Sequence, residues 1–331
     1  MHPVSSASQA ISFQFLGSGR EYFKIWIVNM FLTILTLGVY SAWAKVRKNK
    51  YFYGNTRLGD ASFDYLADPM AILRGRLIAF GLFSVYSVIT NLVPVATLPF
   101  VVLFMLAMPW IAVKSLTFRA RNTAFRNIRF NFTGSYGEAA KWYVGGPMLV
   151  PLTLGLMYPV IIKGQKEFAV ANTAYGTAPF RFEARARDFY ALFVVLLLVI
   201  VAMVSVTVAT QKSVPWMGSI IIIPAYLFIF AFWNSRMGNI VYNASSLEGH
   251  RFVSDLRTRD IMTLYFTNAL AILLTLGLFV PWAKVRLARY RAQRLKLITS
   301  GDIDSFVNNQ AENVSSAGEE VGEIFDIDIG I

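Results

Sequence analysis

The sequence predicts a mainly α-helical, polytopic membrane protein with three internal repeats separated by two transmembrane hairpins. Of its 331 residues, 56% are hydrophobic and 15% are charged, whereas soluble domains carry about 25% charged residues. Residues 25–44, 142–162 and 261–283 contain no charged side chain, and apolar runs of about 20 residues are long enough to cross a bilayer. The segment at residues 36–47 also returns in closely similar form at residues 275–286, which indicates an internal repeat.

The repeat extends into three units, at residues 12–66, 128–183 and 250–298. The second unit follows the first at a constant offset of 117 residues, which relates Phe13 to Phe130 and Phe63 to Phe180. The third unit follows the first at 239 residues, which relates Phe13 to Phe252. The periodicity predicts that each unit contains a helix, a glycine turn and short strands.

An acidic residue begins the helix of each unit, and a glycine ends it. Acidic side chains suit the first turn, where the helix dipole is positive, and they are Glu21, Glu138 and Asp260. After the helix, a glycine can adopt the left-handed backbone that closes a helix without a clash of its Cβ atom. These glycines are Gly38, Gly155 and Gly277.

A basic segment rich in aromatic residues follows the glycine in the first and third units. Trp and Tyr favour the headgroup level of a membrane, and Lys and Arg can extend outward to water. We therefore predict a lipid-headgroup interface formed by Trp43, Lys45, Arg47, Lys48, Lys50, Trp282, Lys284 and Arg286. An aromatic cage for a ligand is the alternative, and membrane anchoring is favoured over it.

Two further apolar segments, at residues 77–113 and 189–233, are each long enough for a transmembrane hairpin. If every unit helix also crosses the membrane, the protein has seven spans and its basic residues divide between the two sides. If the unit helices instead turn back, 30 of the 31 basic residues lie on one side and Lys212 lies on the other. Because positive loops are retained in the cytoplasm, the second arrangement with cytoplasmic basic loops is favoured, and seven spans remain the alternative.

Side chains that could carry chemistry are few. Asn29 and Asn268 occupy equivalent positions in the unit helices, where they are expected to make intramembrane contacts between helices; a polar path is the functional alternative. The chain has no cysteine, two distant histidines and no recognisable catalytic or metal-binding motif. We therefore expect no cofactor, no metal site and no enzymatic activity.

The charge is divided between a basic body and an acidic end. Residues 300–331 contain eight acidic residues and no basic ones, which leaves 31 basic and 11 acidic residues, a net charge of +20, in the preceding chain. A basic body is attracted to anionic headgroups, so the expected partner is the lipid bilayer, with anionic lipids, and not nucleic acid. Residues 300–331 are expected to form a disordered tail, and residues 1–11 a short N-terminal tail; protein partners are left open.

The phrase Leu-Thr-Leu-Gly-x-x-x-x-Trp-Ala-Lys-Val-Arg stands at residues 35–47 and again at residues 274–286. With the following Tyr51 and the segment at residues 55–59, it resembles the YjgN-like family of bacterial multi-pass inner-membrane proteins. The second unit departs from the motif at residues 160–164. The resemblance implies a location in the inner, or cytoplasmic, membrane, and the family carries no known function.

Two functions fit these features. Internal repeats with broken helices are common in transport proteins, so the favoured interpretation is a passive channel or transporter of an unidentified solute. The alternative is a membrane factor without transport activity, which binds anionic lipid or a protein partner at the cytoplasmic face through its basic residues.

Overall fold

The computed structural model describes residues 9–210 and 215–326, and within them ten antiparallel strands form a closed barrel. Each strand pairs with its neighbours in sequence, and the first strand also pairs with the tenth, which closes the ring. The strands are β1 (Ala10–Phe15), β2 (Thr56–Leu58), β3 (Ala61–Tyr65), β4 (Thr123–Phe125), β5 (Ile128–Phe132), β6 (Thr173–Tyr175), β7 (Ala178–Phe182), β8 (Ser245–Leu247), β9 (His250–Ser254) and β10 (Leu295–Ile298).

Tight two-residue turns join β2 to β3, β4 to β5, β6 to β7 and β8 to β9. Arg126 and Asn127 both have positive φ angles, of 46° and 66°, and Glu248 and Gly249 have φ angles of 43° and 87°. Two successive left-handed residues are the mark of the type I′ turn, whose twist matches that of the paired strands. The turns all lie at one end of the barrel, because the strands alternate in direction.

Within the described chain, five helical segments connect these hairpins at the opposite end of the barrel. They are α1 (Gly19–Leu35) with α2 (Ser41–Gly54); α3 (Pro69–Leu92) with the 3-10 turn η1 (Pro94–Ala96) and α4 (Thr97–Arg121); α5 (Tyr136–Ala140) with the π-helical turn η2 (Lys141–Gly145), α6 (Gly146–Leu152) and α7 (Tyr158–Ala171); α8 (Ala186–Thr210) with α9 (Pro215–Asn243); and α10 (Thr258–Leu274) with α11 (Val280–Gln293). Each segment runs away from the barrel, turns, and returns to it.

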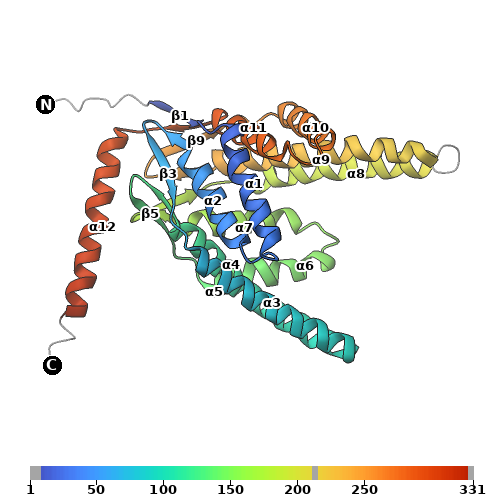
Figure 1. Cartoon of the computed structure of the whole chain (residues 1–331), viewed down its shortest axis with the longest axis horizontal. Helices are drawn as coiled ribbons and strands as arrows, with labels where there is room; N and C mark the ends of the chain where they lie inside the picture. Colours follow the sequence, from blue (N-terminus) through green and yellow to red (C-terminus); the bar gives the residue numbers. More distant parts are fainter. Residues whose placement is uncertain (1–8, 211–214, 327–331) are drawn as a thin grey trace.

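A last helix, α12 (Ile303–Asp326), follows β10 at the turn end of the barrel. Figure 1 shows α12 on one side of the strands, with α3, α8 and α9 extending from the other side. The barrel thus lies between α12 and the five helical segments.

One backbone hydrogen bond recurs at all five places where a strand gives way to a helical segment. The residue after an outgoing strand donates its N–H to the carbonyl of the residue that ends the returning helix, at 2.9 to 3.0 Å. The pairs are Leu16 with Asn55, Leu66 with Asn122, Thr133 with Asn172, Glu183 with Ala244, and Asp255 with Arg294. The same junction is therefore built five times around the ring.

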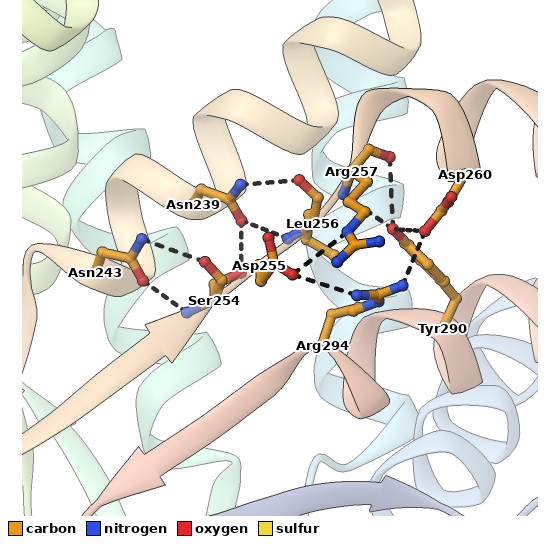
Figure 2. A network of polar contacts seen from close by, with 9 residues as sticks. All are labelled: Asn239, Asn243, Ser254, Asp255, Leu256, Arg257, Asp260, Tyr290 and Arg294. Atoms are coloured by element: carbon orange, nitrogen blue, oxygen red, sulfur yellow. Dashed lines mark hydrogen bonds and ion pairs between the residues drawn. The ribbon is translucent and has the colours of Figure 1, made fainter.

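The junction between β9, α9, α10 and α11 is held by polar side chains (Figure 2). Asn239 of α9 accepts from the N–H of Leu256 and from the hydroxyl of Ser254, each at 2.8 Å. Tyr290 of α11 donates to Asp260 at 3.0 Å, and Arg294 also contacts Asp260 at 3.0 Å. These side chains satisfy backbone groups where the strand ends, which gives them a structural role.

The acidic residue at the start of a unit helix makes a bond beyond its own helix in all three units. In the first unit Tyr51 donates to Glu21 at 3.2 Å, as Tyr290 does to Asp260 in the third. In the second unit Asn172 donates to Glu138 at 3.1 Å. All three acidic residues lie in the first helical turn, as the sequence predicted.

The predicted architecture of three repeats separated by two transmembrane hairpins is wrong, and so is the mainly α-helical fold class, which placed only short strands within each repeat. The closed barrel overturns both, because the segments around residues 77–113 and 189–233 join strands of the same ring as the other helical segments do. The strands β2, β4, β6 and β8 have three residues each, too few for a recognisable strand pattern.

The ends of the chain also differ from expectation. Where we predicted a disordered tail over residues 300–331, the structure has α12, an amphipathic helix whose first turns pack on the barrel. Three further predictions fall outside the described residues. They concern residues 327–331 of the predicted C-terminal tail, most of the predicted N-terminal tail at residues 1–11, and Lys212.

Candidate functional site

Among the described residues, three segments have the length and composition to cross a membrane. They are Pro69–Leu92, Pro94–Arg121 and Ala186–Thr210. Their apolar side chains are largely exposed, as in Leu82 and Phe80 of α3 and Leu198 of α8. A continuous apolar helical surface of this kind matches a hydrocarbon environment.

The three shorter helical segments expose leucine at their tips. Leu37 and Leu276 are each 95% exposed and Leu154 is 93% exposed, and all three have left-handed φ angles of 48° to 50°. The predicted glycine follows each of them, at φ angles of 93° for Gly38, 86° for Gly155 and 92° for Gly277. A large apolar side chain presented in this way is unfavourable in water and favourable in lipid.

Helix length separates the long segments from the short ones. At 1.5 Å per residue, α3 with its 24 residues is about 36 Å long, and α1 with 17 residues is about 26 Å long. The hydrocarbon core of a bilayer is about 30 Å thick. Helix α3 is therefore longer than this thickness, and α1 is shorter than it.

Basic residues lie near the barrel in all five helical segments, and in the segments whose turns are described they lie between an apolar tip and the barrel. We call this set the basic collar: Arg20, Lys24, Lys45, Arg47, Lys48, Lys50, Arg74, Arg76, Lys114, Arg119, Arg121, Lys141, Lys163, Lys166, Arg187, Arg236, Arg259, Lys284, Arg286, Arg289 and Arg291. Each lies within nine residues of the end at which its helical segment meets the barrel, so the basic residues occupy a band next to the barrel in all five segments.

The two copies of the predicted headgroup interface differ. On α2, Lys45, Arg47, Lys48 and Lys50 are exposed, and the Arg47 guanidinium lies 5.9 Å from the Tyr40 ring centre. This copy has the accessibility that a headgroup contact requires.

The copy on α11 instead packs between helices. The ring of Trp282 lies 5.1 Å from that of Phe23 on α1, and a Cβ atom at Gly19 would stand 2.2 Å from it. Arg286 donates to Asn268 at 2.7 Å, while Lys284 is exposed.

Asn29 and Asn268 are both buried, each 6% exposed, but their amide oxygens differ. The oxygen of Asn268 accepts the bond from Arg286. The equivalent arginine of the first unit is Arg47, which lies over Tyr40 instead. Within the described residues, the Asn29 oxygen is the buried side-chain atom that has no hydrogen-bond partner.

The barrel encloses an apolar cavity of about 530 Å³. One phenylalanine from each odd-numbered strand up to β9 lines it, and these form a ring: Phe13, Phe63, Phe130, Phe180 and Phe252. Ring centres lie 6.1 to 6.4 Å apart between Phe13 and Phe63, Phe13 and Phe252, Phe130 and Phe180, and Phe180 and Phe252. Eight strands make a barrel that side chains can fill, so ten leave this space.

Hydroxyl groups at the helix end of the cavity are already engaged. The lining residues that begin the even-numbered strands β2 to β8 each donate to the carbonyl four residues earlier, at 2.7 to 2.9 Å. They are Thr56, Thr123, Thr173 and Ser245. Tyr175 likewise donates its hydroxyl to the carbonyl of Phe125, and burial raises its pKa to about 12.

Helix α12 covers the turn end of the cavity. Ile303, Phe306 and Val307 form part of the lining. The Gln310 side-chain oxygen accepts from the N–H of Thr177 at 3.1 Å. Asp304 forms an ion pair with Arg126.

His250 lies beneath α12, with its ring 4.9 Å from that of Phe306. Its Nδ1 accepts from the N–H of Ser300 at 3.3 Å, which assigns the neutral tautomer with the proton on Nε2. Burial lowers its pKa, and the nearby Glu248 charge opposes that shift in part.

The cavity was not identified from the sequence, although its signal was present. The offsets relating Phe13 to Phe130 and Phe252, and Phe63 to Phe180, connect the five ring residues. In residues 9–210 and 215–326, no three His, Asp or Glu side chains group closely enough to hold a metal ion.

Comparisons with known proteins show to which family the chain is related. A family model described as "Bacterial protein of unknown function (DUF898)" matches residues 10–324. The chain is 33% identical over 149 residues to "Inner membrane protein YjgN" of Salmonella typhimurium (strain LT2), which covers 44% of this chain and 38% of that protein. It is 31% identical over 155 residues to the Escherichia coli (strain K12) protein of the same name, covering 46% and 38%. No solved structure matches the chain.

The match thus spans less than half the length of these curated relatives. Their names, together with the three apolar helices, identify a membrane protein. The resemblance to YjgN-like proteins is confirmed, and the chain belongs to the DUF898 family of bacterial proteins.

Proposed function

We propose that this protein is a membrane factor without transport activity that binds anionic lipid headgroups through its basic collar at the cytoplasmic face. The observation that carries the proposal is the order of features along each helical segment. In the four segments whose turns are described, an apolar tip comes first, basic residues follow, and the barrel comes last; in α8 and α9 the basic residues also lie next to the barrel. This order matches hydrocarbon, headgroups and water in turn.

The collar is favourable for anionic lipid because its positive charge forms a band around the barrel end of the helical segments. A basic residue near a membrane surface that carries anionic lipid contributes about 1 kcal/mol, roughly a fivefold preference. The exposed group Lys45, Arg47, Lys48 and Lys50 on α2 is the densest part of the collar.

The barrel favours this function over the passive channel or transporter suggested above. An ion or polar solute in the lumen would meet the phenylalanine ring, where it loses water without gaining polar partners. Helix α12 also covers the turn end of the lumen.

The test compares two fourfold charge reversals that change the net charge equally. One replaces Lys45, Arg47, Lys48 and Lys50 by Glu. The matched control replaces Arg57, Arg129, Arg251 and Lys296, four exposed basic residues on the strands, by Glu. The protein is placed in nanodiscs of mixed phosphatidylglycerol and phosphatidylcholine, and the lipids retained on ejection are measured by native mass spectrometry.

We expect the wild type and the strand variant to retain phosphatidylglycerol in excess, and the α2 variant to lose most of that excess. Equal retention of both lipids by the wild type, or equal loss in both variants, would overturn the proposal. Solute flux through the same protein in sealed liposomes would instead support a channel.

A further inference from the structure

We propose that the barrel is a binding site for a single hydrocarbon chain, carried by a membrane lipid or by a free fatty acid. This site is separate from the basic collar, because it lies inside the strands. The argument uses the size of the cavity, its lining and its position.

The cavity is too large to be an ordinary packing defect. Protein interiors contain few voids larger than a water molecule, and this one measures about 530 Å³. That volume falls within the range of small-molecule sites, about 300 to 1,000 Å³.

The lining selects an apolar occupant. The phenylalanine ring crosses the middle of the lumen, and Leu58, Leu247 and Leu297 extend the apolar wall. Water gains little in such a space, because it needs two to four polar partners. The hydroxyls of Thr56 and Thr173 cannot donate to it either, since they already donate to helix carbonyls at 2.7 Å.

The helix end of the cavity faces the side of the barrel from which the helical segments extend. At the helix end it is lined by Tyr53 of α2, Val170 of α7 and Tyr242 of α9. Helices α2 and α7 return to the barrel from turns that expose Leu37 and Leu154. At the other end Phe306 and Val307 of α12 line the lumen, so a chain that enters from the helix end extends toward an apolar surface.

The test is photo-crosslinking to the full protein in phosphatidylcholine liposomes. Two probes carry the same mid-chain diazirine, one as a free fatty acid and one as an acyl chain of phosphatidylglycerol. In the wild type, mass spectrometry should locate adducts on lumen residues such as Phe130, Phe180 and Leu247.

A filled cavity provides the specific control. Leu297→Trp adds an indole inside the lumen, and Lys296→Trp adds the same group on the outer wall of the same strand. Leu297→Trp should lower lumen labelling roughly tenfold. This factor corresponds to about two methylene groups of the bound hydrocarbon chain that the indole excludes from the lumen. Lys296→Trp should leave the labelling unchanged.

Thermal unfolding establishes whether each variant is folded. If Leu297→Trp unfolds, Leu247→Trp, with Ser246→Trp as its outer-wall control, provides the same comparison. Labelling restricted to the outer surfaces of α3 and α8, or lumen labelling that Trp inside the barrel does not reduce, would overturn the proposal. The probe that labels the lumen more strongly identifies the source of the chain.

The result is independent of the collar. The fourfold α2 charge reversal should not change how strongly the mid-chain diazirine of the fatty acid labels the lumen. This should hold even if the same variant loses its preference for phosphatidylglycerol. Failure of one proposal can therefore be distinguished from failure of the other.

Discussion

Asn29 and Asn268 are equivalent in sequence, yet leucine at the two positions should change stability in opposite directions. Asn268→Leu removes the acceptor of the 2.7 Å bond from Arg286 and leaves a half-buried guanidinium without it. Hydrogen bonds to charged groups contribute about 1.5 to 3 kcal/mol, so we expect a loss of about 2 kcal/mol in the free energy of unfolding.

Asn29→Leu removes a buried oxygen that has no partner in the described chain. An unsatisfied buried polar group costs about 1 to 3 kcal/mol, so its replacement by an apolar side chain should be neutral or stabilising by about 1 kcal/mol. A neutral bond between membrane helices contributes only about 0.6 kcal/mol, too little to reverse this sign.

The assay is thermal unfolding in one detergent, followed by tryptophan fluorescence. Asn268→Leu should lower the midpoint by roughly 4 °C, and Asn29→Leu should leave it unchanged or raise it. The double variant Asn268→Leu, Arg286→Leu should recover part of the loss, because no guanidinium then lacks its acceptor. Equal destabilisation by the two single variants would refute the reasoning.

Three further predictions concern the turns, the barrel and the membrane orientation. Gly277→Ala should lower the free energy of unfolding by about 1 kcal/mol, because Gly277 has a φ angle of 92° that alanine adopts only with strain. Gly54→Ala should cause no such loss, because Gly54 also lies in open space but lacks a positive φ angle. A denaturant titration measures both. Burial lowers the pKa of His250 in the folded protein, so on acidification the unfolded chain takes up a proton at this residue first. The free energy of unfolding should therefore fall as the pH drops below about 6.5. His250→Gln should flatten this pH dependence, which is measured by unfolding at several pH values. With cytoplasmic basic loops, an impermeant thiol reagent should label Val95→Cys in intact cells and not Asp60→Cys, and the reverse pattern would contradict that orientation.

The sequence was informative about local features that repeat. The glycine turns, the acidic residues of the first helical turn and the apolar segments all follow from residue type and spacing, and the structure has glycines with positive φ at all three expected turns. The sequence did not predict a left-handed backbone at the leucine before each glycine. A residue with a Cβ atom has a steric cost in that conformation, which its surroundings must offset.

The barrel could not be predicted in the same way. Each of the strands Thr56–Leu58 and Ser245–Leu247 pairs on one side with a strand that is distant in sequence: Leu58 pairs with Phe13, 45 residues earlier, and Leu247 pairs with Phe180, 67 residues earlier. Three residues are also too few to show the alternation of a strand. The sequence shows the offsets that relate the five phenylalanines, but a sequence repeat does not indicate that the repeated residues lie close together in the fold. The cavity depends on that arrangement.

The pairing of β1 with β10 also sets an order for synthesis. Ala10 pairs with Ile298, so the ring cannot close until almost all of the described chain has left the ribosome. The helical segments, by contrast, are complete one after another and can enter the membrane as they emerge. Closure is then a late step between distant parts of the chain, and contacts of such long sequence separation form slowly. Until that step, the first strand needs protection from pairing with another molecule.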